Sequence, residues 1–256
     1  MSEYLESLFD LREKIVVVTG SCGQLGKVIC KSFLSSESKV IGVDLEINNK
    51  IKGVDYEKVD ITKEESVQIF FDEAIEKYGK IDILINNAGV SIFEPFQIRD
   101  TSSLDFVSDV NLKGTFFCIK HFARIIDLHN ISDASVVNIA SIYGLISPDY
   151  RIYEEGDRKN SEIYGATKAG VIQMTKYFSV HLSELGIRVN CLSPGGIYNP
   201  DHPQNDNFIN KYSKRNPMNR MANVDEMIGA ILYLSSSASS YTNGHNLIVD
   251  GGMSSW

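Results

Sequence analysis

The sequence predicts an α/β fold, namely one doubly wound domain with a seven-stranded parallel sheet and helices on both faces. Short apolar runs alternate with helical patterns along all 256 residues. Several runs are apolar at consecutive positions, which is typical of strands that are covered on both faces. No Pro/Gly-rich linker or change of composition divides the chain, so we expect residues 1–256 to form a single domain.

The expected strands and helices alternate along most of the chain. Thr62 is placed to cap the second helix, while Gly79 and Gly186 stand where two helices should end. Repeated strand–helix–strand units imply right-handed crossovers between parallel strands. The expected strands cover residues 14–20, 39–44, 56–61, 80–89, 135–141, 187–196 and 245–252, and the helices 24–35, 63–78, 103–121, 164–184 and 225–236.

Two long stretches interrupt this alternation, at residues 142–163 and 197–224. Both follow the C-terminal end of an expected strand, which is the side where open α/β sheets bind ligands. Loops this long inside a compact domain are usually functional or disordered. We therefore expect both on the substrate side of the domain, the second with a short helical piece near 207–213.

Composition and charge exclude several classes of protein. The formal net charge is −8, and no basic stripe is present that could neutralise phosphates, so a nucleic-acid partner is not expected. No apolar run is long enough to span a bilayer, and the acidic start of the chain does not resemble a signal peptide. The 4 cysteines form no CxxC pair, so we expect no metal site and a reducing cytoplasm.

The stretch VTGSCGQLG, residues 18–26, places Gly20, Gly23 and Gly26 between a strand and a helix. In this context glycines let the backbone approach a pyrophosphate, and the helix N-terminus offers free N–H donors. Asp44 closes the next strand, where a carboxylate can accept both hydroxyls of an adenosine ribose and repel a 2′-phosphate. The pattern favours NAD as the cofactor, the alternative being a tight turn without a ligand.

Tyr164 and Lys168 lie one helical turn apart at the start of an expected helix, so they share one face. An ammonium group beside a phenol favours the phenolate and lowers its pKa toward the range of an acid–base catalyst. The pair by itself is common and usually has no such role.

Together these features resemble the short-chain dehydrogenase/reductase family, whose domain is of the Rossmann type. The resemblance extends over essentially the whole chain. Each matching segment stands at the expected place in the alternation, and this order makes the combination specific. The matching segments are the glycine loop 19–26, Asp60-Ile61, Asn86-Asn87-Ala88-Gly89, Asn111 in VNLKG, Ser141, Tyr164 with Lys168, Pro194-Gly195, and Val249-Asp250-Gly251-Gly252.

The resemblance implies a role for each catalytic residue. Tyr164 would exchange a proton with the substrate oxygen, and Lys168 would lower its pKa and hold the nicotinamide ribose. Ser141 would hydrogen-bond the reacting oxygen, and Asn111 would hold a water that links Lys168 to solvent. A homodimer or homotetramer is also implied. The implied cofactor-binding set is Gly20, Gly23, Gln24, Leu25, Gly26, Asp44, Asp60, Ile61, Asn87, Ala88, Gly89, Tyr164, Lys168, Pro194, Gly195 and Ile197.

The sequence departs from the family pattern in three places. Gln24 stands where most single-domain members carry glycine, and Asn199 where Thr or Ser is frequent. The segment between Ser141 and Tyr164 is longer than usual, and within it Arg151, with Tyr150 and Tyr153, could grip a phosphate or carboxylate and stack on a sugar ring. A solvated flap or a subunit contact is the equally weighted alternative for this segment.

We therefore predict an NAD(H)-dependent oxidoreductase that interconverts a secondary alcohol and a ketone, with a sugar or sugar derivative as substrate. Segments of 142–154 and 193–199 also resemble a subgroup of the family associated with bacterial surface-glycan and flagellin-modification sugar pathways. Two alternatives stay open: an NADP(H)-dependent carbonyl reductase, and a non-catalytic protein that senses a dinucleotide.

Overall fold

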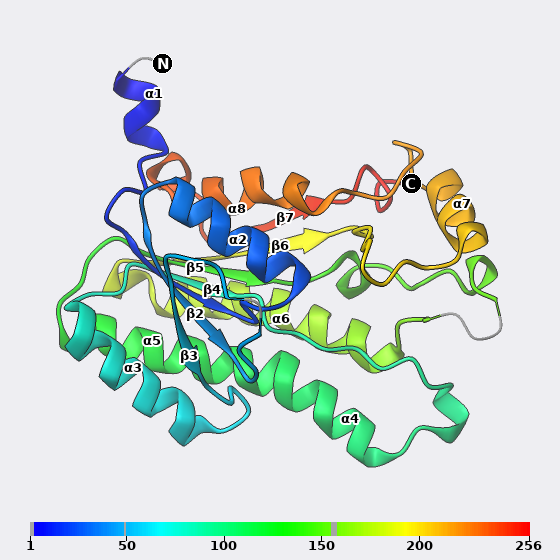
Figure 1. Ribbon diagram of the computed structural model, residues 1–256, viewed down its shortest axis with the longest axis horizontal. Helices are drawn as coiled ribbons and strands as arrows, with labels where there is room; N and C mark the ends of the chain where they lie inside the picture. The colour runs from blue at the N-terminus through cyan, green and yellow to red at the C-terminus, as the bar shows by residue number, and fades with distance from the viewer. Residues whose placement is uncertain (1–2, 49, 155–157) are drawn as a thin grey trace.

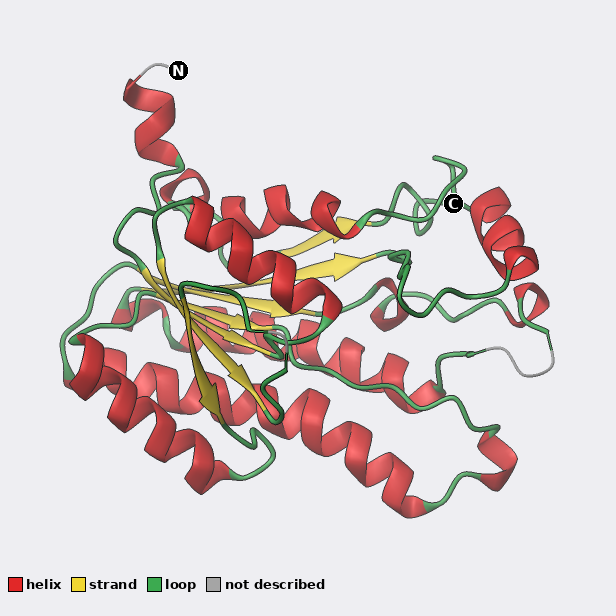
Figure 2. Cartoon of the chain, viewed as in Figure 1, coloured by secondary structure: helices red, strands yellow, loops and turns green. Residues whose placement is uncertain are grey.

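The computed structural model describes residues 3–48, 50–154 and 158–256. At its centre lies a 7-stranded sheet in the order β3-β2-β1-β4-β5-β6-β7, in which every pairing is parallel. Helices cover both faces of this twisted sheet (Figure 2). The predicted fold class is confirmed. The strands are β1 (Ile15–Thr19), β2 (Lys39–Asp44), β3 (Val54–Lys58), β4 (Ile83–Asn86), β5 (Ala134–Ile139), β6 (Ile187–Pro194) and β7 (Asn246–Val249).

The helices form two layers around the sheet (Figure 1). One layer holds α2 and α8, which contact each other, and the other holds α3, α4, α5 and α6. The short helix α1 projects from the body near the N-terminus. Their bounds are α1 (Glu3–Leu8), α2 (Gln24–Ser35), α3 (Glu64–Tyr78), α4 (Thr101–Ser108), α5 (Thr115–Leu128), α6 (Glu162–His181), α7 (Asp206–Arg215) and α8 (Ile228–Ser235).

The two helical layers explain why β1 is apolar at four consecutive positions, Ile15 to Val18. All of its residues are buried. Val17 packs into the core on the α3 and α5 side, whereas Val16 and Val18 pack into the core on the α2 and α8 side. A strand with both faces covered needs no polar alternation.

Three local features differ from the prediction. The single helix expected over 103–121 is divided into α4 and α5 by a π-helical segment, Asp109–Gly114. Thr62 does not cap α3: Lys63 occupies the N-cap, and the Thr62 hydroxyl donates to Asp60 instead. Helix α1 was not expected. Gly79 and Gly186 do end their helical segments, with φ of 78° and 71°.

The strand order reverses at β1, whose neighbours are β2 on one side and β4 on the other. In such sheets the carboxyl ends of the strands diverge at the reversal and leave a crevice. The stretches 142–154 and 197–224 follow β5 and β6 and extend beyond the ends of these strands, together with α7 (Figure 1).

Candidate functional site

The glycine loop between β1 and α2 is packed so closely that Gly20 and Gly26 have no room for a side chain. Gly20 has a φ of +63°, and a Cβ atom there would lie 2.7 Å from the Cα of Ala88. A Cβ on Gly26 would lie 2.0 Å from the carbonyl oxygen of Gly20. Gly23 occupies the N-cap position of α2, so no side chain there accepts a hydrogen bond from the first turn of the helix. Backbone therefore lines this turn, and the N-terminus of α2 can face an anion.

Asn87 ties the end of β4 to this glycine loop. Its side-chain amide donates to the carbonyl oxygens of Thr19 and Gly20, both at 3.0 Å. In return the Thr19 hydroxyl accepts from the N–H groups of Asn87 at 3.1 Å and Ala88 at 3.0 Å. These bonds hold the segments after β1 and β4 together at the crevice.

A cavity of about 680 Å³ lies against the glycine loop. At its edge the Asp44 carboxylate accepts the N–H groups of Cys22 and Leu45, each at 2.8 Å, so its orientation is fixed. Asp60 is likewise held by the N–H and hydroxyl of Thr62. The N-terminus of α2 without a side-chain cap, the exposed backbone of the glycine loop and the fixed Asp44 carboxylate together fit an adenine dinucleotide. The predicted residues that line this cavity are Gly20, Gly23, Gln24, Leu25, Gly26, Asp44, Asp60, Ile61, Asn87, Ala88 and Gly89.

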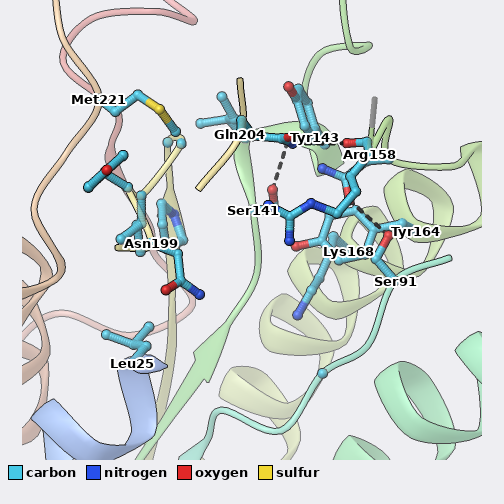
Figure 3. Close-up of a pocket in the computed structure, with 18 of the residues that line it drawn as sticks. Leu25, Ser91, Ser141, Tyr143, Arg158, Tyr164, Lys168, Asn199, Gln204 and Met221 are labelled. Atoms are coloured by element: carbon cyan, nitrogen blue, oxygen red, sulfur yellow. Dashed lines mark hydrogen bonds between the residues drawn. The ribbon is translucent and has the colours of Figure 1, made fainter. Parts of the chain in front are cut away.

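A second cavity of about 420 Å³ adjoins the first, and Leu25, Asn87, Gly89 and Val90 line both. Figure 3 shows Ser141, Tyr164 and Lys168 grouped in this second cavity. Residues from the carboxyl ends of β5 and β6 and from α6 thus meet around one space. The other predicted residues that line it are Pro194, Gly195, Ile197, Asn199 and Tyr153.

Helix α6 positions Tyr164 and Lys168. Its N-cap, Ser161, accepts the N–H of Tyr164 at 3.3 Å. One turn further along, Lys168 is 4% exposed and donates its ammonium to the carbonyl oxygen of Ile139 at 2.7 Å. The Lys168 nitrogen lies 5.7 Å from the centre of the Tyr164 ring. The shared helix face predicted from the spacing is confirmed.

The pKa values of this pair differ from the expectation. Burial raises the pKa of Tyr164, and a hydrogen bond with Ser141 acts in the opposite direction. Burial also lowers the pKa of Lys168 to about 8. Desolvation therefore dominates both groups, and the expected lowering of the phenol pKa by the ammonium is wrong for the protein chain alone.

Asn111 lies in the π-helical segment and is 1% exposed. Its side-chain oxygen accepts the N–H of Val90 at 2.9 Å, and its amide donates to the Val90 carbonyl and the Thr167 hydroxyl, both at 3.0 Å. It lines neither cavity. Asn111 thus holds the segment after Gly89 against α6, and the water-binding role implied by the resemblance stays a prediction.

The predicted substrate residues divide into two groups. Tyr153 and Asn199 line the second cavity, whereas Tyr150 and Arg151 do not. Asp149 holds Tyr150 and Arg151 away from the cavity, because its side chain caps the turn Tyr150–Ile152 and binds the Arg151 guanidinium at 2.9 Å. Tyr150 is consequently 71% exposed, while Tyr153 turns inward and hydrogen-bonds the Tyr143 hydroxyl at 3.2 Å.

The structure adds cavity residues that the sequence analysis did not select. Arg158 follows the undescribed residues 155–157 of the long loop, and Gln204 and His202 come from the loop after β6. Tyr212 of α7 accepts the Gly196 N–H at 2.6 Å and so holds the segment after β6 in place. A charged residue in an unusually long loop was a usable signal for Arg158, whereas residues 202–212 carry no local motif.

No group of His, Cys, Asp and Glu residues in the described part of the chain could hold a metal ion. Within the same residues, no helix combines the length and apolar character needed to cross a membrane.

Comparison with known proteins places this geometry among characterised oxidoreductases. A family model described as enoyl-(acyl carrier protein) reductase matches residues 25–254. The chain is 31% identical to an NADH-dependent L-xylulose reductase from Ambrosiozyma monospora, over 100% of both chains. Its structure resembles a short-chain dehydrogenase from Leptospira borgpetersenii with bound NAD+ (TM-score 0.89, 35% identity, covering 99% of this chain and 96% of that one).

It also resembles a gluconate 5-dehydrogenase from Burkholderia cenocepacia in complex with NADP and tartrate. Here the TM-score is 0.85 at 26% identity, covering 98% of this chain and 99% of that one. The similar structures therefore include complexes with both nicotinamide cofactors.

Proposed function

Because this chain belongs to the short-chain dehydrogenase/reductase family of oxidoreductases, we propose that it interconverts a secondary alcohol and a ketone with NAD(H). The observation that carries the proposal is the meeting of Ser141, Tyr164 and Lys168 in a cavity that adjoins the glycine-loop cavity. A substrate in the second cavity would lie beside a cofactor in the first. This is the arrangement that a direct transfer between them requires.

The nicotinamide cofactor supplies hydride acceptance or donation when bound. The chain itself orients the reacting carbon and handles the proton. For reduction of a ketone, Tyr164 donates its phenolic proton to the carbonyl oxygen. Ser141, which hydrogen-bonds the same tyrosine, orients the substrate oxygen. The buried Lys168, whose nitrogen lies 5.7 Å from the centre of the Tyr164 ring, favours the phenolate that remains, because its ammonium attracts the negative charge of the phenolate.

Asp44 supports NAD rather than NADP as the cofactor. Its carboxylate is fixed by two backbone N–H groups at the edge of the glycine-loop cavity, and the loop 20–26 contains no arginine. A ribose 2′-hydroxyl can donate to this carboxylate, whereas a 2′-phosphate would meet its negative charge. An NADP(H)-dependent carbonyl reductase is the alternative that this residue disfavours.

A sugar or sugar derivative is our proposed substrate class. Hydroxyl and amide groups line much of the second cavity, among them Ser91, Asn160 and Gln204. The relatives that act on xylulose and gluconate support the same class. The narrower resemblance to the surface-glycan subgroup, the homodimer or homotetramer and the cytoplasmic location remain predictions.

The test is turnover by the purified protein against a panel of sugars, sugar alcohols, sugar acids and sugar phosphates, with NAD and NADP in parallel. Tyr164→Phe should lower kcat by roughly 10²- to 10⁴-fold. NADH binding, followed by fluorescence titration, should largely persist in this variant, because the glycine loop and Asp44 are unchanged. Undiminished turnover by Tyr164→Phe would refute the assignment of the acid–base group. Tight NADH binding with no turnover of any compound would favour the dinucleotide-sensing alternative.

A further inference from the structure

The second cavity has a charge opposite to that of the protein. The chain carries a formal net charge of −8, yet the described residues that line this cavity include no Asp or Glu. They do include Arg158 and Lys168, together with His202. Such a lining attracts a negative group and disfavours a positive one.

Arg158 is held in the cavity wall by two contacts with the loop after β6. Its guanidinium donates to the carbonyl oxygen of His202, and its own carbonyl accepts the side-chain amide of Gln204 at 3.2 Å. Figure 3 shows Arg158 on the same side of the cavity as Ser141 and Tyr164, with Asn199 on the other side. The guanidinium is thus placed by the fold in the wall of the cavity that holds Ser141, Tyr164 and Lys168.

Arg158 differs from other arginines of the chain in its partners. Arg151 and Arg215 bind Asp149, Arg124 binds Asp72, and Arg220 binds Glu226. Within the described residues, no carboxylate forms an ion pair with Arg158. A half-buried guanidinium with one backbone acceptor keeps N–H donors for a ligand, and its planar fork matches a carboxylate or a phosphate.

We propose that Arg158 binds an anionic group on the substrate, so that the enzyme acts on an acidic sugar derivative, a sugar acid or a sugar phosphate. The proposal rests on the function proposed above and narrows its substrate class. Arg158 would hold the anion while Ser141 and Tyr164 engage a secondary hydroxyl elsewhere on the same molecule. Specificity would follow, because a neutral sugar leaves the guanidinium without its partner.

The experiment compares three polyols that differ in one group: sorbitol, which is neutral, gluconate, which carries a carboxylate, and sorbitol 6-phosphate. The wild-type protein should show a higher kcat/KM for one of the anionic compounds than for sorbitol. Arg158→Gln should raise KM for that compound roughly 10- to 100-fold with a small change in kcat. Arg158→Lys, which keeps the charge, should restore part of the loss. The compound whose KM rises in Arg158→Gln shows whether the guanidinium binds a carboxylate or a phosphate.

Lys159→Gln is the matched control, because Lys159 is exposed, lies next in the chain and does not line the cavity. Lys159→Gln removes the same charge, and KM for the anionic polyol should stay within about twofold of the wild-type value. Equal kcat/KM for neutral and anionic polyols in the wild type would overturn the proposal. An equal loss of activity toward sorbitol and the anions in Arg158→Gln would also overturn it, since that result describes a structural role.

A binding measurement separates this proposal from the proposed function. Tyr164→Phe saturated with NADH is titrated with inorganic phosphate and with gluconate by calorimetry, with and without Arg158→Gln. Weaker binding of either anion in the double variant supports the Arg158 site even if no polyol of the panel is oxidised. Unchanged binding of both anions overturns it, whatever the turnover panel shows.

Discussion

The glycine-loop cavity, which we assign to the cofactor, and the second cavity, which we assign to the substrate, are built in different ways. On the cofactor side, consecutive residues after β1 and after β4 form the wall, and backbone atoms make the decisive contacts. On the substrate side, the wall combines Tyr153, Arg158 and Tyr164 with residues of the segment 194–221, which meet only through the tertiary fold. Backbone geometry that is local in sequence can be recognised as a motif, whereas side chains from distant loops cannot. The same difference determines how mutations should act on the two sides.

Gly26→Ala should produce the largest effect and break the cofactor side alone. The new Cβ would meet the backbone carbonyl of Gly20 at 2.0 Å, and backbone cannot move aside as a flexible side chain can. We expect a loss of about 3 kcal/mol or more in the free energy of unfolding and a loss of NADH binding, measured by urea denaturation and fluorescence titration.

Gly229→Ala is the control for this prediction. Gly229 also lies in the first turn of a helix, but a Cβ there has no atom within 4 Å, so the variant should be neutral or slightly stabilised. Similar losses in the two variants would contradict our account of the glycine loop.

Lys168 lies where the two sides meet, and its burial predicts a pH dependence of stability. The folded chain releases this proton near pH 8, whereas the unfolded chain holds it up to the ordinary pKa of 10.5. Between these pH values the unfolded state binds more protons, so the stability contributed by Lys168 rises with pH. Below pH 8 the buried charge costs up to about 3 kcal/mol.

The measurement is the difference in free energy of unfolding between the wild type and Lys168→Met, followed from pH 7 to pH 10.5 without cofactor. The difference should shift in favour of the wild type by about 2–3 kcal/mol as the pH rises. Lys159→Met removes an exposed lysine from the neighbouring loop and controls for the lost charge. A flat difference for Lys168→Met would show that the ammonium is better solvated than its 4% exposure indicates.

Asp44→Ala should sharpen the assignment of the cofactor side by changing specificity more than stability. We expect the preference for NAD over NADP, measured as the ratio of kcat/KM values, to fall roughly tenfold or more. Asp44→Asn separates charge from structure, since its amide oxygen can still accept the Cys22 N–H. If neither variant changes the ratio, Asp44 does not select the cofactor.

Gln24 connects the two sides, and its substitution should have the smallest effect. Its amide donates to the carbonyl oxygen of Tyr198 at 2.7 Å, joining the start of α2 to the loop after β6. Gln24→Met removes this bond at similar size and should cost less than about 1 kcal/mol. Substrate KM should rise severalfold, and amide exchange in residues 197–205 should accelerate. Unchanged exchange there would show that other contacts hold the loop.

Much of the cofactor side was predictable from the sequence. Asp44 ends a strand, while the glycine loop, Asp60 and the segment around Asn87 each follow shortly after one. Parallel strands bring their carboxyl ends to one edge of the sheet. The pairing of Tyr164 with Lys168 was equally accessible, because helical periodicity alone places them on one face. These predictions depend on local backbone geometry, which neighbouring residues determine.

Only the tertiary structure decided the rest. Tyr150 and Arg151 were predicted to face the substrate, but Asp149 holds Arg151 outside, and Arg158 lines the cavity in its place. The π-helical segment at Asn111 and the dominance of burial over charge in the Tyr164 pKa were equally hidden. The reason is physical: the orientation of a loop side chain and the solvation of a buried charge depend on atoms brought from distant parts of the chain. The sequence by itself predicted the fold and the residues of the glycine-loop cavity, whereas the packing of the two loops decided which charged side chain lines the second cavity.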